Sequence, residues 1–300
     1  MQSYKIPLSL AVLLFEAKIE ASLAFGRWLL VDCPGVRVRL DGLFKKWARL
    51  LLGADSWRNG AVATSELGWG LGGFCRCVRS VALRRAKLLM LPPSDPYATI
   101  FRLASDRGIG WAETSRALLR KWGIPDWNSW AFRSYVEYKS QVDAQLGIGF
   151  SEVWASHAAE HCGQVPYTFF QASPSQALRD AWSLRLPWDV QLALRSWCRL
   201  RAGLIMLRHI KGERSDARHQ RCIFCDGPSR NGTVHVLGVC GAWRTLRDGL
   251  LRAMGLVCSP EADEFTQAFF EVGVGSPVFS HVAMFAQDID RRAESFWTDR

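Results

Sequence analysis

The sequence lacks any long uninterrupted apolar run. Charged residues break every candidate before it reaches the ~18 residues of a membrane-spanning helix. An apolar run at residues 6–15 is followed by Glu16, Lys18 and Glu20, without the small-residue cleavage site of a signal peptide. We therefore expect a buried helix at the N-terminus and no membrane among the partners of this chain.

The sequence also lacks the paired cysteines of a secreted, disulfide-rich domain. Its cysteines number nine, which is odd, and they are scattered over 300 residues. Thiols in this pattern are typical of a reducing compartment. The predicted location is therefore intracellular, in the nucleus, the cytoplasm or both.

The chain does have ample material for a packed core, with 49% hydrophobic and 12% aromatic residues. Apolar residues recur at steps of three and four along most of it, which is the spacing of one face of an α-helix. Helices are predicted at residues 40–52, 61–67, 71–91, 96–104, 242–254, 261–271 and 278–297. The fold class is therefore predicted to be mainly α.

Four parts are predicted along the chain. A helical lobe (1–145) is followed by a helical connector (146–194), and the glycine-containing residues 145–150 link the two. Residues 195–255 combine a basic helix with a cysteine-rich loop, and residues 256–300 form acidic C-terminal helices.

The cysteine-rich loop has the spacing C-x2-C-x9-H-x4-C, formed by Cys222, Cys225, His235 and Cys240. Three thiolates and one imidazole at this spacing are typical of a tetrahedral zinc site. All four positions are filled by side chains and no Glu lies inside the motif, so we predict one structural Zn²⁺ rather than a catalytic ion. The alternative is a set of unrelated thiols near a turn beside a buried histidine.

Charge is concentrated around this loop. The chain carries a net charge of +10, and residues 195–252 contain twelve Lys or Arg against four acids, whereas residues 261–300 contain eight acids against three Arg. A basic block attracts phosphate backbones by releasing condensed counterions, so RNA or DNA is the predicted partner. Phe224 or Trp243 is predicted to stack on an unpaired base. The predicted phosphate contacts are Arg195, Arg199, Arg201, Arg208, Lys211, Arg214, Arg218, Arg221, Arg244 and Arg247.

A second group of arginines lies on the helix predicted at residues 71–91, where Arg76, Arg79, Arg84 and Arg85 occur with no acid between them. These cations fit a solvated helix face and a nucleic-acid contact face equally well.

One pattern resembles a catalytic motif. His157, Glu160 and His161 have the order H-x-x-E-H of inverted metallopeptidases, in which two histidines hold zinc and the glutamate activates water. The acids at a suitable distance downstream lie in or beside the cysteine-rich loop, so no third ligand is free. We interpret the pattern as a helix surface and predict no catalytic residues.

Two stretches resemble the region behind the polymerase core of non-LTR (LINE-type) retrotransposon reverse transcriptases. The first, RLDGLFKKWARLLLGADSWRNGAVATSELGW at residues 39–69, is similar to the thumb segment of that family. The second, LRSWCRLRAGL at residues 194–204, is similar to the arginine-rich helix that precedes a C-terminal Cys-Cys-His-Cys motif there. The resemblance implies a thumb-like lobe at residues 1–145, a nucleic-acid-binding zinc knuckle, and a reverse-transcriptase core upstream as a partner.

Departures from that family limit what the resemblance implies. The paired metal-binding aspartates of the polymerase are missing, because no Asp-Asp dipeptide occurs in the chain, and Gly203 is followed by Leu204 rather than by a polar helix start. The expected function is thus nucleic-acid binding without polymerase chemistry. Two alternatives stay open: a protein-interaction module stapled by zinc, and a non-functional relic of a retroelement.

Overall fold

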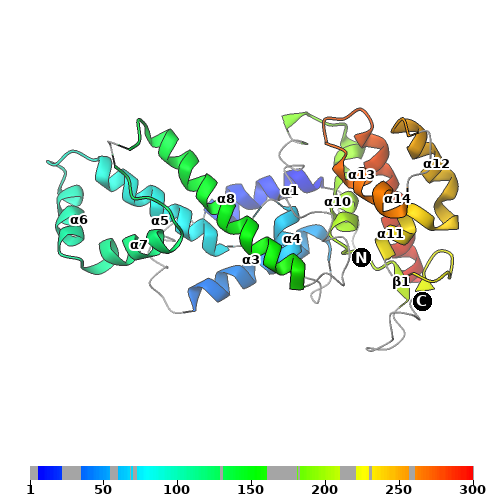
Figure 1. The fold of residues 1–300 in the computed structure, drawn as a ribbon, viewed down its shortest axis with the longest axis horizontal. Helices are drawn as coiled ribbons and strands as arrows, with labels where there is room; N and C mark the ends of the chain where they lie inside the picture. The colour runs from blue at the N-terminus through cyan, green and yellow to red at the C-terminus, as the bar shows by residue number, and fades with distance from the viewer. Residues whose placement is uncertain are drawn as a thin grey trace. The chain divides into compact units, whose positions relative to one another are not determined.

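The computed structural model describes residues 6–21, 35–54, 60–67, 69, 73–128, 131–160, 181, 183–209, 221–229, 232–256 and 261–299. These residues are mostly helical, with a single two-stranded sheet among them, so the predicted mainly α class is confirmed (Figure 1). The chain divides into two compact units. Unit 1 consists of Met1–Leu13, Ala48–Gly68 and Ala158–Arg300, and unit 2 consists of Leu14–Trp47 and Trp69–His157.

Unit 2 is built from helices whose apolar faces pack on one another. They are η1 (Phe15–Glu20), most of α3 (Val36–Leu52), α5 (Gly73–Met90), α6 (Pro96–Asp106), α7 (Gly110–Lys121) and most of α8 (Tyr135–Glu160). Asp95 caps the N-terminus of helix α6, because its carboxylate accepts hydrogen bonds from the backbone N–H groups of Tyr97 and Ala98. Helix α3 ends at Leu52 and is followed by Gly53, which adopts the left-handed backbone conformation that favours glycine (φ +66°).

The core of unit 2 lies between α5, α7 and α8. Its buried members are Val78, Val81, Ala82, Ala86, Leu119, Ile124, Tyr138 and Val142. Aromatic residues contribute to this core: Tyr138 is fully buried, and Trp111, Trp122, Trp127 and Tyr135 pack against the same cluster. A second aromatic group joins Phe15, Phe44, Trp47 and Trp69.

Unit 1 contains the predicted metal motif and the C-terminal helices. Its elements are α1 (Leu8–Leu14, except its last residue), α4 (Gly60–Glu66), α10 (Trp188–Arg201), β1 (Arg208–His209), β2 (Arg221–Cys222), α11 (Gly232–Val234), η5 (His235–Val239), η6 (Gly241–Trp243), α12 (Arg244–Ala253), α13 (Ala262–Glu271) and α14 (Phe279–Thr298). Among the described residues of this unit, helices α10 and α14 share the most extensive helix–helix contact (Figure 1). Trp197 of α10 meets Phe279 of α14 edge to face.

Two predictions about local structure have different outcomes. The N-terminal run forms helix α1 with Leu8 and Val12 buried, as predicted. The link predicted at residues 145–150 was wrong, because these residues lie inside the continuous 26-residue helix α8. A glycine inside a helix costs only about 1 kcal/mol relative to alanine, which neighbouring helix formers and packing can offset. No helix among the described residues is long and apolar enough to cross a membrane.

Candidate metal centre

The four predicted ligands come from two short segments of unit 1. Cys222 ends strand β2, and Cys225 lies in the tight turn that follows it. Hydrogen bonds from the Asp226 N–H to the Cys222 carbonyl (3.0 Å) and from the Cys222 N–H to the Gly227 carbonyl (2.9 Å) close this turn. His235 begins the π-helical turn η5, and Cys240 follows the end of that turn.

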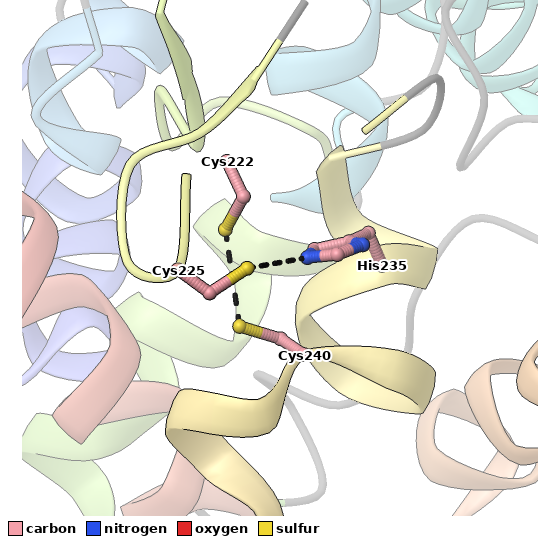
Figure 2. Close-up of side chains that lie close together, drawn as sticks. All are labelled: Cys222, Cys225, His235 and Cys240. Carbon is pink, nitrogen blue, oxygen red and sulfur yellow. Dashed lines mark hydrogen bonds between the residues drawn. The ribbon is translucent and has the colours of Figure 1, made fainter. Parts of the chain in front are cut away.

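The four side chains converge on one point (Figure 2). One ligand atom from each of Cys222, Cys225, His235 and Cys240 lies within 4.8 Å of all the others. The Cys225 Sγ lies 3.2 Å from the His235 Nε2, and the Cys222 Sγ lies 3.9 Å from the Cys240 Sγ. Tetrahedral zinc with Zn–S and Zn–N bonds of about 2.3 and 2.0 Å needs ligand atoms roughly 3.3–3.8 Å apart. The cluster therefore fits one metal ion with small adjustments of the side chains.

The ligands differ in their exposure to solvent. Cys222 and Cys240 are fully buried, His235 is half-buried, and Cys225 is exposed. Gly227 leaves room at the exposed side, because a Cβ at this position would lie 3.3 Å from the Cys225 Sγ. The centre thus has a closed inner side and one sulfur facing the solvent.

Groups around the cluster favour a thiolate at Cys222. The backbone N–H of Phe224 donates to the Cys222 Sγ at 3.4 Å. The hydrogen bond between the two buried sulfurs is the main cause that lowers the pKa of Cys222, and the same bond raises the pKa of Cys240. A divalent cation bound between these two sulfurs would displace the proton of this hydrogen bond.

Arg247 supports the centre from helix α12. Its buried guanidinium donates from Nη1 to the carbonyl oxygens of Cys240 (3.2 Å) and Leu237 (3.4 Å). These carbonyls belong to a ligand and to the turn that separates two ligands. Three thiolates and a neutral imidazole around a divalent ion leave net negative charge, which the guanidinium beside Cys240 offsets.

The centre is embedded in the helical body of unit 1. Trp243 is buried and meets Phe224 and Phe285 edge to face, which joins the ligand turn to helix α14. Turn η5 packs so closely on α13 that a Cβ on Gly238 would lie 2.4 Å from the Cβ of Ala262. A metal at this site would therefore join the loop to α12, α13 and α14.

Four of the predicted nucleic-acid contacts belong to the interior instead. The buried Arg199 donates to Asp290 and to Glu294 of α14, both at 2.8 Å. The buried Arg201 pairs with Glu66 of α4 at 3.0 Å. Arg247 is also buried and donates to backbone carbonyls. These three arginines were predicted to contact phosphates, but they are structural groups instead. Trp243 was predicted to stack on a base, but it belongs to the core. A buried cation or indole cannot reach a phosphate or base without unfolding its surroundings.

The other predicted contacts lie in several settings. Arg244 is exposed, and the exposed Arg221 pairs with Asp226 at 3.1 Å. Arg195 is half-buried and donates to the Ile6 carbonyl, and Phe224 is half-buried. The side chain of Arg208, and Lys211, Arg214 and Arg218 as a whole, lie outside the described residues.

The arginines of helix α5 are also largely engaged within unit 2. Arg85 is fully buried and donates to Asp126, to the Ala112 carbonyl and to Ser115. Arg79 forms a bidentate pair with Asp143, and Arg76 pairs with Glu16. Only Arg84 of the four is exposed among the described side chains. Both interpretations are therefore wrong for Arg85, which is an internal group, whereas Arg76 and Arg79 form ion pairs that are partly exposed to solvent.

Sequence reasoning missed the acidic partners Glu66, Asp290 and Glu294. For Asp290 and Glu294 the signal available was the opposite charge of the basic block and of residues 261–300. No such signal pointed to Glu66. The H-x-x-E-H pattern cannot be placed, because the side chains of His157 and Glu160 and the whole of His161 lie outside the described residues. Compared with models of protein families, with curated proteins and with solved structures, the chain shows no match.

Proposed function

We propose that residues 195–255 form a zinc-stabilised nucleic-acid-binding region, similar to the part behind the polymerase core of non-LTR reverse transcriptases. One observation carries the proposal: four metal-binding side chains lie within 4.8 Å of one another, with exposed arginines next to the first ligand and shortly after the last. A polymerase core encoded upstream would be the partner that supplies the chemistry. An intracellular, reducing location would keep the thiols available to the metal.

Zinc is the metal that this set of donors favours. Three sulfurs and one imidazole nitrogen in a tetrahedral arrangement suit Zn²⁺, whereas oxygen ligands would suit Mg²⁺ or Ca²⁺. The four ligands complete the coordination, so the ion has no open position for a water molecule and its role is structural. Its binding would fix the turn that contains Arg221 and Phe224 against the helical body.

Cations on both sides of the centre support the nucleic-acid part of the proposal. The side chain of Arg221 is 62% exposed, and its partner Asp226 is 70% exposed. Such a pair is weak in water, so a phosphate can replace the carboxylate at small cost. Arg244 is exposed at the start of α12, and Phe224 on the same turn as Cys225 is partly accessible to a base.

A gel-shift experiment tests this proposal with single-stranded RNA and double-stranded DNA at several salt concentrations. We expect binding that weakens steeply with salt and is lost with a zinc chelator. The double variant Arg221→Gln, Arg244→Gln should reduce the salt slope by roughly two, one for each phosphate contact removed. Arg120→Gln, an exposed arginine of unit 2, is the control and should leave the affinity unchanged. Affinity independent of both salt and chelator would contradict the proposal.

The burial of the centre favours a second candidate function. Trp243, Cys222 and Cys240 are part of the core, so a metal here would staple the helices of a scaffold that binds another protein. This alternative predicts folding that depends on zinc together with no affinity for RNA or DNA. The same gel-shift series separates the two candidates.

A further inference from the structure

Exposure singles out one sulfur of the candidate metal centre. Of the described cysteines, Cys77, Cys198, Cys222 and Cys240 are buried and Cys75 is partly covered, whereas Cys225 is exposed. Oxidants dissolved in water reach an exposed thiolate first, and a metal-bound thiolate is already deprotonated. Cys225 is therefore both accessible to oxidants and, when bound to the metal, in the reactive thiolate form.

The two buried sulfurs differ in their position relative to Cys225, because Cys240 belongs to another segment. Cys240 is fixed by its N–H bond to the His235 carbonyl (2.7 Å) and by the bond of its own carbonyl with Arg247. Cys222 lies three residues before Cys225 on the same tight turn, and their ligand atoms are within 4.8 Å. A disulfide needs the two sulfurs to approach to about 2.05 Å. A conformational change confined to this turn can bring the sulfurs of Cys222 and Cys225 to that distance.

We infer that Cys225 is the oxidation site of the metal centre, and that hydrogen peroxide converts Cys225 and Cys222 to a disulfide with loss of the metal. This inference rests on the proposed zinc centre. The Cys225 thiolate attacks one peroxide oxygen, which breaks the O–O bond, forms a sulfenic acid and releases hydroxide. The Cys222 thiolate then attacks that sulfur, so the S–S bond forms and a second hydroxide leaves. Two thiolates lose two electrons in total and one peroxide gains them.

The consequence follows from the position of the two cysteines. After oxidation only His235 and Cys240 remain as ligands, which is too few to hold zinc tightly. The turn that contains Arg221 and Phe224 is then no longer joined to η5 by the ion. Peroxide would thus switch off whatever the proposed zinc-fixed turn binds, while the Trp197–Phe279 packing of α10 on α14 persists.

The test uses the full chain loaded with zinc and treated with limiting hydrogen peroxide. Zinc release is followed with a coloured chelator, and tryptic peptides are mapped by mass spectrometry. Cleavage after Arg221 and Arg230 places Cys222 and Cys225 in one peptide and Cys240 in another. We expect the peptide of residues 222–230 to become lighter by two hydrogens in step with zinc release. A first product that links this peptide to the one containing Cys240, or oxidation elsewhere before zinc release, would overturn the inference.

Matched variants strengthen the test. Cys225→His keeps four zinc-binding side chains and removes the exposed sulfur, so peroxide should release zinc at least about tenfold more slowly. Cys240→His makes the same exchange at a buried position and should release zinc as fast as the original chain. Equal slowing in both variants would contradict the role of Cys225. A chain that holds no zinc before peroxide is added would instead refute the metal centre itself, and if the variants fail to hold zinc, the peptide map of the original chain decides.

Discussion

At the residue scale, Arg247 has a role that its charge alone did not indicate. It lies in the basic block and was expected to face a phosphate, yet it holds the carbonyls of Leu237 and Cys240 from inside the protein. Such contacts orient a ligand residue and balance the charge of the thiolates. The same residue type three positions earlier, Arg244, is exposed. The two arginines therefore form a natural pair for a comparison.

We predict that Arg247→Met lowers the affinity of the centre for zinc by about 10- to 100-fold, because the ligand turn loses its hydrogen bonds and its neighbouring positive charge. Arg244→Met should leave the zinc affinity unchanged. Competition with a chelator of known affinity measures both. Equal zinc affinities in the two variants would show that Arg247 does not support the centre.

Gly238 marks the closest approach of the ligand turn to helix α13. An added Cβ would lie 2.4 Å from the Cβ and 2.6 Å from the Cα of Ala262, so the backbone must move. We predict that Gly238→Ala lowers the free energy of unfolding by about 1–3 kcal/mol. Gly249 in α12 has nothing within 4 Å of an added Cβ. Gly249→Ala should therefore raise the free energy of unfolding by about 0.5–1 kcal/mol. Urea unfolding measures both changes, which should have opposite signs. An unchanged free energy of unfolding in Gly238→Ala would refute the close contact.

At the scale of elements, a buried carboxylate of α14, that of Asp290, pairs with Arg199 of α10. Burial raises the pKa of Asp290 from 3.8 to about 6, although the nearby Arg199 acts in the opposite direction. Burial likewise raises the pKa of Glu66, which faces Arg201 of the same helix α10. The folded protein therefore retains protons that the unfolded chain has released.

This arrangement sets the direction of the pH dependence. Between pH 3.8 and about 6 the folded state binds more protons at Asp290 than the unfolded state does, so this group makes the free energy of unfolding fall as the pH rises. We predict that Asp290→Asn removes this contribution, which amounts to about 3 kcal/mol across the window, and leaves the contribution of Glu66. Urea unfolding at several pH values measures it. An unchanged slope would show that Asp290 does not titrate in this range.

Helix α10 also shows what sequence patterns can and cannot predict. The existence of this helix follows from the local spacing of its apolar residues. The four metal ligands could also be predicted, because they and the turn between them lie within nineteen consecutive residues, 222–240. Its surroundings do not follow, because nine of its residues, including Arg199 and Arg201, are buried by segments far away in the sequence. Periodicity places a residue on a helix face but does not reveal which distant helix covers that face. The arginines were therefore assigned to solvent when α4 and α14 in fact bury them.

At the scale of the whole molecule, each of the two units has a core of its own, and all four candidate ligands lie in unit 1. We predict that a chelator removes protection from amide exchange at residues 221–229 and 232–243 and leaves the α5 and α7 amides of unit 2 unchanged. His235→Ala should reproduce the effect without a chelator. Loss of protection throughout unit 2 would contradict independent cores. Hydrogen exchange read by mass spectrometry resolves these segments.

The most direct measurement of the central claim is the spectrum of the chain loaded with Co²⁺ in place of zinc. Three sulfurs and one nitrogen around a single ion should give the intense absorption bands of tetrahedral cobalt, together with sulfur-to-cobalt charge transfer, at one ion per chain. Changing any one of Cys222, Cys225, His235 and Cys240 to Ala should weaken or abolish these bands. A weak octahedral spectrum, or one that persists in these variants, would contradict the metal centre.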